Sequence, residues 1–190
     1  MTTPYLLDTN AYFLFFQNPK PSFYNLLENK LTQGGIVSFY VSEITCMEIH
    51  SVIGKYRRGE PKQNFPCDRN FDNKGQVEKC HNTCVFPGRE KLKPRIYRDL
   101  KKLVEDIEAQ RGLIQATTIP LDSLSIRESR KLLMRNADSY KFGSLDALIA
   151  GSVVATKQVY GLDLTLVTLD RGLRAMLSHE GIPYLDPASL

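Results

Sequence analysis

The chain of 190 residues is long enough for one domain with a hydrophobic core and an appended segment. Its hydrophobic content of 42% and charged content of 24% are ordinary for a globular protein, and no apolar run approaches the roughly 20 residues that a membrane helix needs. The net charge is only +4, and the amino terminus lacks a basic region followed by an apolar one, so we expect a cytoplasmic protein with four reduced cysteines.

Strands and helices alternate along the first 57 residues. The predicted elements are a strand at 5–8, a helix from Thr9 or Asn10 to Gln17, a helix at about 23–31 capped by Ser22, a strand at 36–41 and a helix that Ser42 caps. On this last helix, Ile44, Met47 and Glu48 recur at helical spacing. Glu48 therefore lies on or beside an apolar face, where a carboxylate needs a partner.

The periodicity fails between residues 58 and 94. This stretch contains seven Gly and Pro residues, few aliphatic side chains and three of the four cysteines. A loop of this length inside a compact domain is uncommon and is usually functional or disordered. We therefore predict an insertion at 58–94 within a single domain of residues 1–190.

Regular elements resume after the insertion. They are a helix at 95–114, a strand at 117–121, a helix from Asp122 or Ser123 to Arg135, a helix from Ser144, a strand at 164–168, a helix at 171–178 and a strand at 183–185. Strands that alternate with helices predict an α/β fold with a mainly parallel central sheet flanked by helices.

Four acidic residues stand at strand ends or in the first turns of helices, each beside an apolar run: Asp8, Glu48, Asp146 and Asp170. In an open α/β sheet such positions converge on one crevice. Carboxylates gathered there raise one another's pKa unless a cation joins them, so the pattern predicts a Mg²⁺ or Mn²⁺ site, with one or two ions, suited to phosphodiester hydrolysis.

Taken singly, each acid has a structural explanation. Asp8 and Asp170 are suited to capping the helices that follow them. Asp146 lies where a helix dipole favours negative charge, and Glu48 is suited to an ion pair. The metal site is therefore a hypothesis about the four together.

The basic residues are unevenly distributed. Residues 55–102 hold 14 Lys and Arg against six Asp and Glu, whereas the remainder holds 11 against 15. This segment either grips a polyanion or is a solvated basic surface without a ligand. The candidate phosphate contacts are Arg57, Arg58, Lys62, Lys91, Lys93, Arg95, Arg98, Lys101 and Lys102, with Tyr56, Phe65, Phe71 and Tyr97 interleaved as candidates for base stacking.

The insertion also carries a group of metal-ligating residue types, namely Cys67, Cys80, His81 and Cys84. A Cys₃His zinc site would hold a loop that has no core of its own, although only Cys80 and Cys84 form a close pair. Solvent-facing reduced thiols, or a disulfide formed on purification, are the alternatives.

Four segments resemble the motifs of PIN-domain ribonucleases, most closely the VapC-like toxins of toxin–antitoxin systems. They are Leu6-Leu7-Asp8-Thr9-Asn10, Ser42 to Ile49 with Glu48 as the functional acid, Asp146-Ala147-Leu148-Ile149-Ala150, and Val167-Thr168-Leu169-Asp170. The segment Ile119-Pro120-Leu121-Asp122, leading into Ser125 to Leu133, resembles the strand and helix that precede the third motif. The resemblance spans about 1–57 and 95–190.

The resemblance implies a Rossmann-like PIN fold and a Mg²⁺-dependent endoribonuclease that leaves 5′-phosphate and 3′-hydroxyl ends. It implies metal-site roles for Asp8, Glu48, Asp146 and Asp170, with supporting roles for Thr9, Asn10 and Thr168. It also implies a homodimer and, for the toxin branch, a small antitoxin inhibitor. The insertion at 58–94 is longer than this family leads us to expect.

Two other functions are considered. A PIN-fold module that binds RNA or protein without catalysis would have no use for four mutually repelling carboxylates. A phosphatase with Asp8 as its nucleophile, in the commonest fold for that chemistry, would need a second Asp at position 10, where this chain has Asn10.

Overall fold

The computed structural model describes residues 3–73 and 76–190, with the side chains of residues 71, 73 and 76 outside the description. The body consists of β1 (Tyr5–Leu7), α1 (Thr9–Phe13), α2 (Tyr24–Leu31), β2 (Thr32–Gln33), β3 (Ile36–Ser42), α3 (Glu43–Arg58), α4 (Pro94–Glu108), β8 (Ile114–Ile119), α5 (Ser123–Asn136), α6 (Ser144–Tyr160), β9 (Thr165–Val167), α7 (Arg171–His179), β10 (Tyr184–Leu185) and the 3₁₀ turn η1 (Pro187–Ser189). Between α3 and α4 lie β4 (Gln63–Pro66), β5 (Asn70–Asn73), β6 (Gln76–Lys79) and β7 (Thr83–Phe86).

The central sheet is parallel except at one edge. Its strand order is β10-β9-β1-β3, and β3 continues the sheet by pairing in parallel with β8. The short β2 pairs with β3 antiparallel. The predicted α/β class with a mainly parallel sheet is confirmed, and the carboxyl ends of β1, β3, β8 and β9 lie at one edge.

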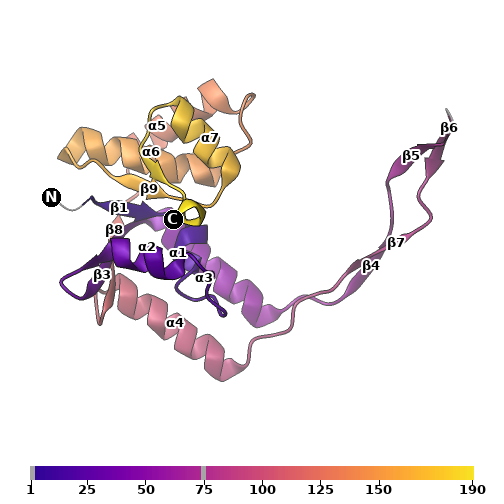
Figure 1. Ribbon diagram of the computed structural model, residues 1–190, viewed down its shortest axis with the longest axis horizontal. Helices are drawn as coiled ribbons and strands as arrows, with labels where there is room; N and C mark the ends of the chain where they lie inside the picture. The colour runs from indigo at the N-terminus through magenta and orange to yellow at the C-terminus, as the bar shows by residue number, and fades with distance from the viewer. Residues whose placement is uncertain (1–2, 74–75) are drawn as a thin grey trace.

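Helices cover both faces of this sheet (Figure 1). Successive strand residues point to opposite faces, so Leu7 and Val167 join the cluster that packs under α1 to α4, whereas Leu6 and Leu166 join the one that packs under α5 to α7. Each of these four side chains is fully buried. Two cores therefore fix the same strands from either side, and they hold the strand ends in place.

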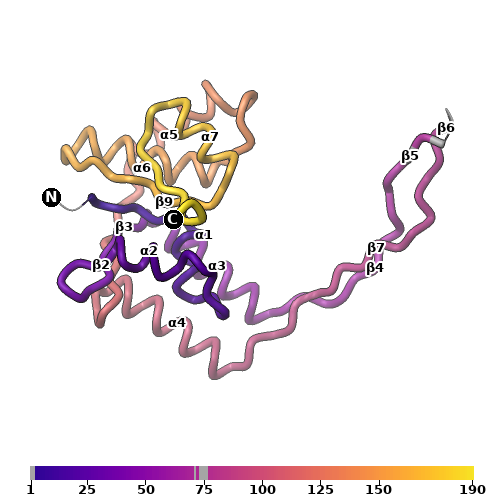
Figure 2. Tube along the Cα trace, viewed as in Figure 1, coloured from indigo at the N-terminus to yellow at the C-terminus, as the bar shows by residue number. Residues whose placement is uncertain are grey.

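The insertion forms a long two-stranded arm rather than an irregular loop (Figures 1 and 2). We define the arm as residues 60–89, because a bridge between Glu60 and Arg89 closes its base. Residue 63 pairs with 86 and residue 73 with 76, and the register does not slip between them. Sequence reasoning missed these strands because polar residues, Pro and Gly replace the apolar alternation that marks a half-buried strand.

Two helices end earlier than expected, and the strand expected at 117–121 lies at Ile114–Ile119. The helix after Asp8 ends at Phe13 and continues only as turns to Gln17. The helix predicted at 95–114 ends at Glu108, because Gln110 and Gly112 adopt positive φ and Ile114 instead begins β8 opposite Val37. Within residues 3–73 and 76–190, no helix has both the length and the apolar character needed to cross a membrane.

Candidate active site at the carboxyl edge of the sheet

Asp8 and Thr168 leave the sheet side by side. Leu7 pairs with Val167 at the ends of β1 and β9, and the Asp8 N–H donates to the Val167 carbonyl at 3.0 Å. Asp8 then caps α1, since its Oδ1 accepts from the Ala11 N–H at 2.6 Å. The side chain is only 4% exposed, and Thr168 is fully buried.

The Asp8 carboxyl resists ionisation in this position. Burial raises its pKa from 3.8 to about 6, although hydrogen bonds from Thr168 and the Ala11 N–H act in the opposite direction. The charges of Asp146 and Asp170 raise the pKa further. The three aspartates therefore lie close enough to repel one another.

Asp146 and Asp170 are each held by a backbone N–H at a helix start. Asp146 lies in the first turn of α6 and accepts from Gly143 at 2.7 Å, and Asp170 caps α7 by accepting from Leu173 at 2.7 Å. Burial raises the pKa of Asp146, and the charge of Asp170 raises it further. The Thr168 hydroxyl accepts from the Asp170 N–H at 3.0 Å, so this threonine orders two of the acids.

Glu48 joins the site through Thr9. The Thr9 hydroxyl donates to Oε2 of Glu48, which joins the first turn of α1 to the middle of α3. Ser42 starts that helix as predicted by accepting from the Thr45 N–H at 3.1 Å. Met47, expected on the same apolar face, is instead 68% exposed, so Glu48 lies at the border of the buried face rather than within it.

Within residues 3–73 and 76–190, the four acids Asp8, Glu48, Asp146 and Asp170 form no salt bridge. Across the same residues, no three His, Cys, Asp or Glu side chains are positioned to hold a metal ion. The available donors are nevertheless carboxylate oxygens, and Mg²⁺ commonly keeps several waters and uses one or two carboxylates, so the residue types fit such an ion.

A pocket of about 350 Å³ opens beside Asp170. Asn10, Lys141, Leu169, Asp170, Arg171 and Gly172 line it. A Cβ on Gly172 would overlap the Lys141 carbonyl oxygen, so this glycine lets the loop before α6 approach α7. Sequence reasoning missed Lys141 and Arg171. The position of Arg171 directly after Asp170 was a signal for one of them, whereas nothing in the local sequence marks Lys141.

The thiols of three arm cysteines, Cys67, Cys80 and Cys84, interact with one another. The Cys67 thiol contacts the thiols of Cys80 and Cys84, and its pKa is lowered first by the Arg69 backbone N–H and then by Cys80. The pairing of Phe65 with Cys84, extended by the bond from Cys67 N to Asn82 O, puts the thiols on one face of the ribbon. The four cysteines are free thiols, and zinc stays a prediction.

The predicted phosphate contacts gather at the base of the arm and along α4. Arg57 donates to the Leu92 carbonyl at 3.4 Å, and Arg95 pairs with Asp99 at 3.9 Å. The Tyr56 ring already contacts the Phe13 ring, stacked at 5.9 Å, and the Arg89 guanidinium at 4.3 Å. The Phe71 side chain lies outside the described residues.

Comparison with known proteins supports the fold. No family model matches the chain, and no curated protein does. Among solved structures, the crystal structure of FitAcB from Neisseria gonorrhoeae matches with a TM-score of 0.59 at 15% identity, over 97% of this chain and 99% of that chain. At this identity the likeness concerns the fold alone.

Proposed function

We propose that the chain is a metal-dependent endoribonuclease that hydrolyses RNA phosphodiester bonds at the edge where β1 and β9 end. The observation that carries this proposal is the group of Asp8, Asp146 and Asp170: the pKa of Asp8 is raised by burial and by the charges of the other two, the pKa of Asp146 is raised by burial and by the charge of Asp170, and none of the three has a basic partner in the described residues. Such repulsion costs stability, and a divalent cation would remove the cost. The sequence resemblance to PIN-domain ribonucleases supports the same conclusion.

Asp8, Glu48, Asp146 and Asp170 would together hold Mg²⁺ or Mn²⁺, one or two of them directly and the others through waters on the ion. Such an ion would lower the pKa of a bound water and neutralise charge on phosphate oxygens. Thr9 orients the Glu48 carboxylate, and Thr168 orients Asp8 and Asp170. The pocket beside Asp170 receives the substrate phosphate, since Lys141 and Arg171 supply positive charge there and Asn10 supplies an amide.

We further propose a toxin role, as a homodimer whose activity a small antitoxin inhibits. This part of the proposal is supported by the VapC-like motifs together with the fold likeness to FitAcB. Co-expression of the neighbouring open reading frame, followed by measurement of host growth and of the mass of the purified complex, tests it directly. Growth arrest that no neighbouring product relieves would contradict the antitoxin part.

Cleavage of structured and single-stranded RNA in Mg²⁺ tests the enzymatic proposal. We expect 5′-phosphate products that EDTA, Asp8→Asn and Asp146→Asn each abolish. Asp122→Asn is a matched control, because Asp122 caps α5 with the same 2.6 Å bond to a backbone N–H but lies outside the acidic group. RNA that binds but is never cut in Mg²⁺ or Mn²⁺ would instead indicate a catalytically silent binding module.

A further inference from the structure

The basic surplus of the chain is confined to the base of the arm and to α4. Residues 55–62 and 89–102 together carry 11 Lys and Arg against three Asp and Glu. The outer part of the arm, residues 63–88, carries three of each and has no net charge. Its exposed side chains include apolar Val77 and Phe86, which are 75% and 65% exposed. Polyanion attraction therefore acts at the base and not along the arm.

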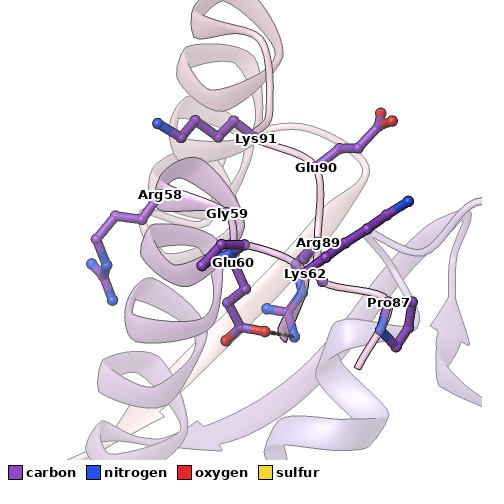
Figure 3. Close-up of a pocket in the computed structure, with 10 residues that line it drawn as sticks. Arg58, Gly59, Glu60, Lys62, Pro87, Arg89, Glu90 and Lys91 are labelled. Atoms are coloured by element: carbon purple, nitrogen blue, oxygen red, sulfur yellow. Dashed lines mark ion pairs between the residues drawn. The ribbon is translucent and has the colours of Figure 1, made fainter. Parts of the chain in front are cut away.

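A pocket of about 600 Å³ lies at this base, and we call it the root pocket. Its lining is Arg58, Gly59, Glu60, Pro61, Lys62, Pro87, Gly88, Arg89, Glu90 and Lys91 (Figure 3). Arg89 is committed to the structure, because it pairs with Glu60 at 3.7 Å and lies over the Tyr56 ring. In the described residues, Arg58, Lys62 and Lys91 form no ion pair, so their charges remain available.

Two glycines build the pocket by letting the backbones approach closely. A Cβ on Gly59 would lie 2.7 Å from Cγ of Lys91, and one on Gly88 would lie 2.6 Å from the Glu60 carbonyl oxygen. Both glycines have positive φ, which other residues adopt at a cost. The aliphatic stem of Lys91 is thus packed against Gly59, the residue after Arg58. Figure 3 shows the side chains of Arg58 and Lys91 extending to the same side of the view.

We propose that Arg58 and Lys91 in the root pocket bind phosphates of the RNA strand at a distance from the cleavage site, whereas the outer arm does not contact RNA. This inference rests on the proposed function and names how its substrate is held. Glu48 and Arg58 stand ten residues apart on the continuous helix α3, which corresponds to about 15 Å. At the 3.4 Å spacing of a stacked strand, that distance corresponds to about four nucleotides.

The test is the binding of a fluorescent single-stranded RNA of about 20 nucleotides, measured by anisotropy in EDTA on an Asp146→Asn background. Arg58→Gln with Lys91→Gln removes two of the four cations that line the root pocket and leaves Lys62 and Arg89 in place. Arg69→Gln with Lys79→Gln removes one Arg and one Lys from the outer arm and is the matched control. Thermal melting followed by circular dichroism checks that both double variants fold.

Two lost phosphate contacts should weaken binding by roughly 25-fold at 0.1 M salt and reduce the slope of log K against log salt by about 1.4. The control pair should leave both values unchanged. The proposal would be overturned if both double variants lost RNA affinity equally, or if the Arg58→Gln, Lys91→Gln variant lost none. Binding of adenosine monophosphate with the same dependence on Arg58 and Lys91 would also overturn it, by assigning the pocket to a free nucleotide.

This readout is independent of catalysis. If the chain never cleaves RNA, the binding comparison still stands or falls by itself. If it cleaves RNA but binds it without regard to Arg58 and Lys91, the root pocket fails while the proposed activity survives.

Discussion

The buried carboxyl of Asp8 should make the metal-free protein less stable as the pH rises. Its pKa in the folded protein, about 6, lies above its ordinary value of 3.8, so the folded state binds the proton more tightly than the unfolded state does. Ionisation of such a group opposes folding, and the full difference corresponds to roughly 3 kcal/mol. About 2 kcal/mol of this is lost between pH 4.5 and 7.5, because Asp in the unfolded chain is already largely ionised at pH 4.5.

Asp8→Asn should remove this loss while keeping the cap, because Asn and Asp are similarly good N-cap residues. The measurement is urea unfolding in EDTA at pH 4.5 and at pH 7.5. The informative quantity is the difference in free energy of unfolding between variant and wild type, and how that difference changes with pH. We expect that difference to move by about 2 kcal/mol in favour of the variant as the pH rises. Titrating groups that do not interact with Asp8 are common to both proteins, so their contributions cancel.

Asp122→Asn is the control, because the pKa of Asp122 is shifted in the opposite direction from that of Asp8. Hydrogen bonds from Ser125 lower the pKa of Asp122, so removing its charge should not stabilise the protein at pH 7.5. Parallel pH profiles for wild type and Asp8→Asn would refute the reasoning, since they would mean that the Asp8 carboxyl titrates alike in the folded and unfolded chains.

Three further predictions concern the same edge of the sheet. Adding Mg²⁺ should raise the melting temperature of the wild type but not of Asp146→Asn, and equal shifts would remove Asp146 from the metal site. Gly172→Ala should lower the free energy of unfolding by about 1–3 kcal/mol, seen as a lower urea midpoint, because its Cβ would meet the Lys141 backbone. Gly54→Ala should not lower it, because the space around Gly54 admits a Cβ. Thr168→Val should raise the pKa of Asp8, as followed by carboxyl ¹³C shifts, because it removes a hydrogen bond that favours the carboxylate.

Much of the body follows from local pattern in the sequence. Leu6 and Leu7 stand in a short apolar run bounded by Pro4 and Asp8, and the structure buries them on opposite faces of one strand. An acid directly after such a strand must lie at the carboxyl edge of a parallel sheet. The approach of Asp8 to Asp170 could therefore be predicted without coordinates.

The remainder depends on contacts between distant segments. Glu48 is held by Thr9, a contact that spacing along one helix does not reveal. Lys141 reaches the pocket because Gly172, on another element, leaves room for its carbonyl group. The arm escaped prediction because a ribbon exposed on both faces carries no burial pattern, and its strands are evident only from their pairing with each other.

The closed base of the arm has a consequence for how the protein can vary. Because Glu60 and Arg89 bring the outgoing and returning chain together, the length beyond them places no demand on the path of α3 or α4. Adding one residue to each strand would extend the ribbon by about 3.4 Å and turn the outer side chains to the opposite face. Only additions of two residues per strand would preserve the orientation of these side chains. The length of the arm can therefore change in two-residue steps while the globular part stays as it is.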